Sequence, residues 1–289
     1  MQVELNSPCK VNFILNILGK RADGFHELET VMQPVPFFDR LSFERARDGI
    51  ELNCDNPELP TGSANLVYRA AEAFLTKARI SDGARIRLTK RIPLAAGLGG
   101  GSANAATTLL GLNQLFGAPL TFVELDLLAR ELGSDVPFFL QNKPAIAVGR
   151  GEQVTPVEAF QSLAGFHILL IHPGFGISTA WAYNNLAPFP AALNGQAGRA
   201  QRFVEDLQVS VERALPDFYN SLEAPVLRKF PLLAIFQEHL RECGATVALM
   251  SGSGSTTFAL IENEAKAADI QTRFISKFGS FCWIASVPL

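Results

Sequence analysis

The segment GLGGGSANAA has four glycines among the five positions 97–101, and a helical pattern follows from Ser102. Glycines let the backbone adopt positive φ and approach a ligand closely, so that several N–H groups can point to one side. The N-terminus of the following helix adds N–H donors and the positive end of its dipole. The segment therefore predicts a phosphate site. The alternative is a tight turn that packs a helix against a strand, which needs fewer glycines.

The same segment departs from the two common nucleotide-binding motifs. It lacks the Gly-Lys-Ser/Thr ending of a P-loop, and Ser102 occupies the third glycine position of the dinucleotide fingerprint. A phosphate bound here needs a positive charge from another part of the chain.

A second motif, SPCKVNF, places Lys10 and Asn12 on one face of an expected strand, because side chains alternate along a strand. Taken alone, Lys10 is typical of a solvated lysine. The sharper interpretation is a positive charge aimed into a cleft.

A third motif, LGSDVPFFL, carries a carboxylate in a short connection. Pro137 disfavours helix at Val136, so Asp135 follows the helix stop at Gly133. A carboxylate in this position is often a helix cap. A catalytic base is the alternative.

The fourth motif, GKRADGFHELET, has the turn pair Asp23-Gly24 ahead of Phe25 and His26. An exposed aromatic ring beside a histidine can stack on a planar ligand whose edge the imidazole hydrogen-bonds. A loop aromatic that tucks into a nearby core is the alternative.

Composition excludes several classes of protein. The chain has 289 residues, 48% of them apolar and 18% charged, with a formal net charge of -3, which fits a globular protein with two domains. The absence of a dense Lys/Arg run argues against nucleic acid as a partner. Apolar runs are too short for a membrane span, and the N-terminus lacks a signal or transit pattern, so we expect a cytoplasmic, bacterial protein. Monomer and homodimer both stay open.

Cysteine and histidine spacing gives no metal motif. The four cysteines lie far apart without a C-x-x-C pair, and the four histidines show no H-x-x-x-H spacing. We expect reduced, packing cysteines and no structural metal.

The pattern along the chain predicts mixed elements without a strict β-α-β alternation, which favours two α+β domains, 1–154 and 155–289. In the first half we expect a strand at 1–20, a hairpin at 39–54, helices at 63–78, 102–116 and 121–133, and strands at 84–93 and 144–154. In the second half we expect a buried strand at 166–174, a surface or mobile segment at 186–200, two strands joined by a Gly/Ser turn at 245–261, a helix at 264–278 and a strand at 280–289.

Five motifs in one order carry a family resemblance. SPCKVNF, RADGFHEL, PLAAGLGGGSANAA, GSDVPFF and MSGSGST together resemble the kinase superfamily of galactokinase, homoserine kinase and mevalonate kinase, the GHMP kinases. The resemblance is densest over 6–151, 172–183 and 250–258 and weakest over 186–245. RADGFHEL and the triple glycine resemble the branch whose acceptor is a cytidylated methylerythritol.

The resemblance implies a ribosomal-S5-like N-terminal domain, a ferredoxin-like C-terminal domain and an active site in the cleft between them. It implies that ATP, with Mg²⁺, phosphorylates the 2-hydroxyl of the cytidylated methylerythritol in the non-mevalonate route to isoprenoids. A sibling kinase acting on homoserine, mevalonate or a sugar is one alternative. A catalytically dead, nucleotide-dependent regulator is another.

The resemblance also assigns residues. Lys10 and Asp135 match the catalytic positions. The substrate positions are Asn12, Phe25, His26, Thr179 and Tyr183, where Phe25 replaces the tyrosine more usual in the family and keeps its stacking face. The ATP-binding segment corresponds to Pro93, Leu94, Ala95, Ala96, Gly97, Leu98, Gly99, Gly100, Gly101, Ser102 and Ala103, with Ser102 also a candidate Mg²⁺ ligand.

These assignments suggest a mechanism. Asp135 accepts the proton of the acceptor hydroxyl, and Lys10 keeps that carboxylate ionised and stabilises the developing charge. The side-chain charge that the glycine segment lacks would then come from Lys10.

Overall fold

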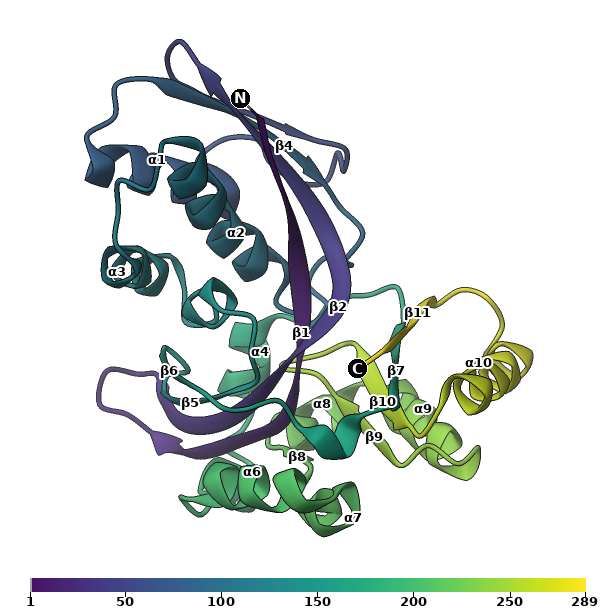
Figure 1. Cartoon of the computed structure of the whole chain (residues 1–289). Coiled ribbons are helices and arrows are strands. Elements are labelled where there is room, and N and C mark those ends of the chain that lie inside the picture. Colours follow the sequence, from purple (N-terminus) through teal and green to yellow (C-terminus); the bar gives the residue numbers. More distant parts are fainter. Residues whose placement is uncertain (1) are drawn as a thin grey trace. The chain divides into compact units, whose positions relative to one another are not determined.

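The computed structural model describes residues 2–289, and the chain forms two compact units (Figure 1). Among the described residues, unit 1 consists of 2–9, 37–92 and 99–142, and unit 2 of 10–36, 93–98 and 143–289. The long strands β1 (Gln2–Lys20) and β2 (His26–Ala46) contribute residues to both. The expected domain boundary at residues 154 and 155 stays a prediction.

The sheet of unit 1 is built around β4 (Gly83–Thr89). This strand pairs antiparallel with the end of β2 and parallel with β3 (Ile50–Cys54). The expected hairpin at 39–54 is therefore wrong: the chain turns there, but β4 lies between the two strands. A half-buried apolar strand gains more by pairing on both sides, and Ala84, Ile86 and Leu88 of β4 are accordingly buried.

Three helices, α1 (Leu66–Ala78), α2 (Gly100–Leu115) and α3 (Phe122–Leu132), complete unit 1. A Cβ on Gly111 of α2 would lie 2.3 Å from the ring of Phe43, so α2 packs directly on β2. Helix α3 begins at Thr121 with the capping box to Glu124 that the sequence predicts. Local capping chemistry and apolar spacing were enough to place this helix.

Unit 2 contains a four-stranded antiparallel sheet in the order β11-β7-β10-β9. Its strands are β7 (His167–His172), β9 (Val247–Met250), β10 (Thr257–Ile261) and β11 (Trp283–Pro288). Helices lie between β7 and β9 and between β10 and β11, which makes this the ferredoxin-like arrangement. Helices α9 (Pro231–Glu242) and α10 (Glu264–Phe278) share its core, with the rings of Phe236 and Phe274 4.8 Å apart.

Within unit 2, short strands pair beside β1 and β2. The expected single strand at 144–154 is instead two, β5 (Ala145–Gly149) and β6 (Gln153–Pro156), which pair antiparallel across a turn. Gly149 and Gly151 take positive φ there, which permits the tight reversal. β5 pairs with β2, and β8 (Tyr219–Asn220) pairs parallel with β1.

The segment expected to be a surface insertion is folded. Leu186 is fully buried and Ala192 nearly so, both in the core of the ferredoxin-like sheet. The helices of this region are α4 (Thr179–Asn184), α5 (Pro190–Leu193), α6 (Arg199–Val209), α7 (Val211–Ala214) and α8 (Glu223–Lys229), and the 3₁₀ turns of the chain are η1 (Pro137–Leu140), η2 (Gln161–Leu163) and η3 (Leu215–Asp217). Within residues 2–289, no helix has both the length and the apolar character needed to cross a membrane.

Candidate active site

The glycine segment has the backbone of an anion-binding loop. Ala95, Gly97 and Gly99 take positive φ of 49°, 76° and 71°, alternating with residues of ordinary conformation. Such alternation turns successive N–H groups toward a common point. Helix α2 follows at Gly100, two residues earlier than predicted, and its N-cap Gly99 makes no side-chain capping bond. Its first turn holds no acidic residue, so nothing there opposes a bound anion.

Within unit 2, the first part of this segment rests on the Gly/Ser turn between β9 and β10. Ser251 Oγ donates to the Gly97 carbonyl at 2.9 Å, and the Thr256 N–H donates to the Ala96 carbonyl at 3.2 Å. A Cβ on Gly97 would lie 2.1 Å from the Ser251 carbonyl oxygen. Position 97 therefore requires glycine for space as well as for its positive φ.

Lys10 is buried beside this loop, with 3% of its surface exposed, so the interpretation as a solvated lysine is wrong. Its Nζ donates to Asn12 Oδ1 at 2.6 Å and to the Gly97 carbonyl at 3.0 Å. Its backbone N–H also donates to the Leu98 carbonyl at 3.0 Å. The Asn12 amide is fixed in turn, because its Nδ2 donates to Thr30 Oγ1 at 2.8 Å. The structure thus brings a cation to the loop that lacks one of its own.

Asp135 lies half-buried in the turn between α3 and η1, in unit 1. The residue at the N-cap position of η1 is Val136, so Asp135 does not occupy that cap. Lys10 belongs to unit 2, and the joint action of these two residues stays a prediction.

A buried polar network within unit 1 connects the end of β4 with α2. Asp39 is fully buried and accepts from the N–H groups of Arg91 at 2.7 Å and Ile92 at 2.9 Å. It also accepts from Asn104 Nδ2 of α2 at 2.9 Å and forms an ion pair with Lys90. The network therefore fixes both the exit from β4 and the helix that follows the loop. Sequence reasoning missed it, because its members are far apart and form no motif.

Phe25 and His26, the predicted base-binding pair, make separate contacts within unit 2. The His26 ring lies 5.2 Å from the Tyr183 ring, centroid to centroid, at an interplanar angle of 40°. Phe25 is 54% exposed, and the guanidinium of Arg150 lies 4.9 Å from its ring centroid. The structure thus brings His26 and Tyr183 together, and it adds Arg150, which the sequence analysis did not select.

Burial lowers the pKa of His26, and the positive charge of Lys20 lowers it further. A neutral imidazole offers one donor and one acceptor nitrogen. His26 in this form can pair with a planar ligand edge that has both functions.

Thr179 begins α4 and contacts the same Gly/Ser turn that holds Gly97. Its Oγ1 lies 2.9 Å from Ser253 Oγ. Turn 251–256 therefore joins the loop beside Lys10 to the helix that carries Thr179 and Tyr183. The sequence identified this stretch only as a turn and as part of the family pattern.

The predicted Mg²⁺ site has one candidate protein ligand, the hydroxyl of Ser102. Among residues 2–289 there is no cluster of three or more His, Cys, Asp or Glu side chains that could hold a metal ion. Ser102, in the first turn of α2, would supply one hydroxyl oxygen to such an ion. Mg²⁺ in kinases typically binds one or two protein ligands together with nucleotide phosphates and water, so one hydroxyl is compatible with it.

Comparison with protein families matches both parts of the chain. Residues 65–143 match the GHMP kinases N-terminal domain, and residues 191–280 match the GHMP kinases C-terminal domain. Two curated proteins, both named 4-diphosphocytidyl-2-C-methyl-D-erythritol kinase, match over nearly the whole length. The protein of Synechococcus sp. (strain JA-3-3Ab) is 41% identical over 93% of this chain and 88% of its own. That of Citrifermentans bemidjiense is 40% identical over 92% of each.

Solved structures agree. A 4-(cytidine 5'-diphospho)-2C-methyl-D-erythritol kinase superposes with a TM-score of 0.82 at 35% identity, covering 99% of this chain and 100% of that one. Homoserine kinase from Cytophaga hutchinsonii gives a TM-score of 0.77 at 20% identity, over 99% and 93% of the two chains, and so shares the fold. The α+β fold class expected from the sequence is confirmed. This chain belongs to the GHMP kinase family and, within it, to the 4-diphosphocytidyl-2-C-methyl-D-erythritol kinases.

Proposed function

We propose that the chain transfers the γ-phosphoryl group of ATP to the 2-hydroxyl of 4-diphosphocytidyl-2-C-methyl-D-erythritol, giving the 2-phosphate and ADP. The reaction belongs to the non-mevalonate route to isoprenoid precursors. The observation that carries this proposal is the buried ammonium of Lys10, held by Asn12 and by the carbonyl of Gly97 in a glycine loop with alternating positive φ.

Phosphoryl transfer needs positioning and charge stabilisation more than covalent chemistry. The loop Pro93–Ala103 is proposed to cradle the ATP phosphates with its N–H groups and the N-terminus of α2. Lys10 supplies positive charge where negative charge develops, in surroundings from which water is largely excluded. Its two fixed acceptors restrict the ammonium to one direction.

Asp135 is proposed as the group that accepts the proton of the acceptor hydroxyl as the O–P bond forms. Ser102 would hold Mg²⁺ together with the nucleotide phosphates, and the ion would supply charge neutralisation. The predicted roles of Lys10 and Asp135 require that they act on the same hydroxyl.

The cytidine end is proposed to lie at Phe25, His26 and Tyr183. Phe25 presents an exposed ring for stacking, and neutral His26 can hydrogen-bond the edge of the base. Tyr183 supplies a second ring beside His26, and Thr179 supplies a hydroxyl near the turn at 251–256. We place the reaction in the cytoplasm, with small molecules as its only ligands.

The test is release of ADP with the cytidylated methylerythritol as acceptor, beside homoserine, mevalonate and a sugar. Turnover on the cytidylated acceptor alone is expected. Turnover on a non-cytidylated alcohol instead would support a sibling kinase, and ATP binding with no product on any acceptor would support a regulatory protein.

Asp135→Asn is expected to keep ATP binding and to lose turnover by about 10²- to 10⁴-fold, the usual range for a general base. Asp82→Asn, at an exposed position of unit 1, is the matched control and keeps full turnover. Near-normal kcat in Asp135→Asn would remove Asp135 from this role.

A further inference from the structure

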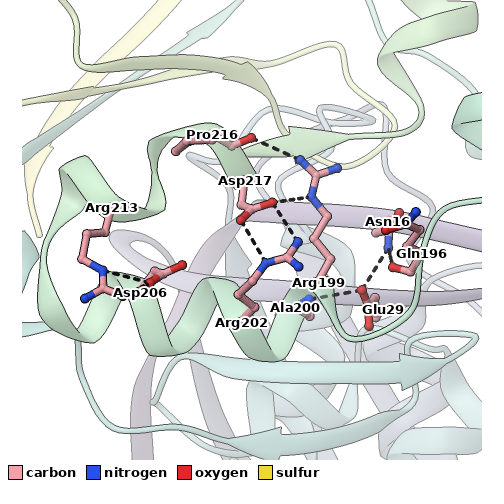
Figure 2. A network of polar contacts seen from close by, with 10 residues as sticks. All are labelled: Asn16, Glu29, Gln196, Arg199, Ala200, Arg202, Asp206, Arg213, Pro216 and Asp217. Atoms are coloured by element: carbon pink, nitrogen blue, oxygen red, sulfur yellow. Dashed lines mark hydrogen bonds and ion pairs between the residues drawn. The ribbon is translucent and has the colours of Figure 1, made fainter.

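Glu29 is a buried carboxylate that lies in the motif GKRADGFHELET but has no predicted role there. It lies on β2, three residues after His26, with 5% of its surface exposed. Burying a carboxylate is costly unless hydrogen bonds replace the water it loses. The donors that replace water are the Asn16 side chain of β1 and two backbone N–H groups at the start of α6. Figure 2 shows Asn16 and Ala200 beside Glu29.

The carboxylate caps helix α6 from outside that helix. Glu29 Oε2 accepts from the Gly198 N–H at 2.9 Å, and Oε1 accepts from the Ala200 N–H at 3.1 Å. Gly198 is the N-cap of α6 and has no side chain to perform this role. A negative charge here also faces the positive end of the helix dipole. Glu29 thus replaces an N-cap side chain.

Asn16 of β1 completes the attachment. Its Nδ2 donates to Glu29 Oε1 and to the Gln196 carbonyl, each at 2.9 Å. The Gly195 N–H donates to the Ile17 carbonyl at 2.8 Å. A Cβ on Gly195 would lie 1.9 Å from Asn16 Oδ1, so the chain passes too close for any side chain. We call these contacts of Asn16, Glu29 and residues 195–200 the β2–α6 latch.

The latch holds one end of the segment 183–200, and the predicted cytidine site lies at the other end. From α4 the chain runs through successive turns, in which the N–H of Leu186 donates to Tyr183, that of Phe189 to Leu186 and that of Asn194 to Pro190. It then reaches Gly195 and the latch. At the start of this segment, Tyr183 contacts His26, and His26 is the first residue of β2, the strand that carries Glu29. The segment between Tyr183 and Ala200 is therefore tied at both ends to the same strand.

Ion pairs also connect α6 to α7 and η3, the elements that follow it. Asp217 pairs with Arg199 at 3.0 Å and with Arg202 at 3.4 Å, and Asp206 pairs with Arg213 at 2.9 Å. These pairs are partly exposed, and exposed pairs contribute little stability. The buried carboxylate is the stronger attachment of the two.

We propose that Glu29 is a positioning residue for the acceptor. By fixing the start of α6 it holds the segment that carries Tyr183 against His26, and so sets the affinity for the cytidylated acceptor. The proposal rests on the proposed function, because it takes His26 and Tyr183 as the cytidine site. Glu29 touches no substrate and acts only through this segment.

The experiment compares Glu29→Gln and Gly195→Ala with two matched controls. Glu29→Gln keeps the shape but replaces one accepting oxygen with a donor, and Gly195→Ala displaces Asn16. Glu238→Gln is the control at an exposed glutamate of α9. Gly62→Ala is the control at a glycine with open space around it.

Both latch variants are expected to raise the KM for the cytidylated acceptor by about 2- to 30-fold, the range for residues that act through a neighbouring element. The KM for ATP and the kcat at saturating acceptor stay unchanged, because only binding of the acceptor is weakened. The controls keep all three parameters. An equal rise in both KM values, or no change in either, would overturn the proposal, whatever the variants do to thermal stability.

Hydrogen exchange separates the latch from the proposed function. In Glu29→Gln, amides of residues 194–200 and of residues 179–186 are expected to exchange faster together. If the unmodified chain fails to phosphorylate the cytidylated acceptor, the proposed function fails and exchange alone decides about the latch. Faster exchange over 194–200 with unchanged exchange over 179–186 would overturn it.

Discussion

Lys10 and Asn12 form a short side-chain hydrogen bond, with Nζ 2.6 Å from Oδ1, although both belong to a strand whose flanking side chains are apolar. The two residues lie on one face because they are two positions apart. Asn12 thereby converts a flexible lysine into an ammonium with a fixed direction.

Asn12→Leu is expected to lower kcat by about 10- to 100-fold, because a buried group that loses its partner costs about 1–3 kcal/mol. Thr30→Val removes the acceptor of the Asn12 amide and acts one step further from Lys10, so its effect has the same direction and a smaller size. Steady-state kinetics at saturating substrates measures both. A larger loss in Thr30→Val than in Asn12→Leu would contradict this order.

Gly97→Ala is expected to weaken ATP binding and to destabilise the fold. A non-glycine residue at φ 76° costs about 1–2 kcal/mol, and the added Cβ would also collide with the Ser251 carbonyl. Gly117→Ala is the control for φ alone, since it has φ 84° and nothing within 4 Å of its Cβ position. Denaturant unfolding and the KM for ATP are the measurements. Equal unfolding midpoints and equal KM values in the two variants would exclude a role for the Ser251 contact.

Acceptor binding is expected to depend on pH through His26. Burial lowers the pKa of this histidine below its usual 6.5, so the neutral form predominates at pH 6.5 and is replaced by the protonated form at lower pH. The KM for the cytidylated acceptor should stay constant down to that region and rise as the imidazole is protonated. Lys20→Gln removes a charge that lowers this pKa, so the rise in KM should begin at higher pH. If the rise in KM of Lys20→Gln began at lower pH instead, the result would contradict the assignment to His26.

The hydroxyls of Thr179 and Ser253 are expected to act as one unit. Thr179→Val and Ser253→Ala each remove one side of their 2.9 Å contact. In a double-mutant cycle on kcat/KM for the acceptor, the coupling should be about 0.5–1.5 kcal/mol. Strict additivity of the two effects would show that the contact does not serve acceptor binding.

The sequence predicted those elements that are determined by residues close together in the chain. Helix α3 begins at its capping box, and α10 spans residues 264–278 as its apolar spacing predicts. Pairing was harder to predict. The strands at 39–54 suggested a hairpin, but β4 comes between them, because a strand more than 30 residues further along supplies the better partner for both. Turn residues show where a chain reverses, and do not show which strand lies beside it.

The site was predictable where chemistry is concentrated in a motif. The glycine loop and the pair Lys10 and Asn12 could be selected from the sequence. The burial of Lys10 could not, because it depends on a carbonyl 87 positions away. Asp39 and Arg150 lie outside the motifs, and Glu29 lies in the fourth motif without a role assigned to it; each of the three acquires its contacts only from the tertiary fold.

Lys10, Asn12 and Asn16 all depend on the alternation of one strand, β1. Inserting or deleting one residue ahead of position 10 would turn the apolar neighbours of these residues to the face that they now occupy. It would disconnect the ammonium from Gly97 and the amide of Asn16 from Glu29 in a single step. Residues 2–20 should therefore accept substitutions at their exposed positions while rejecting an insertion or deletion inside the strand.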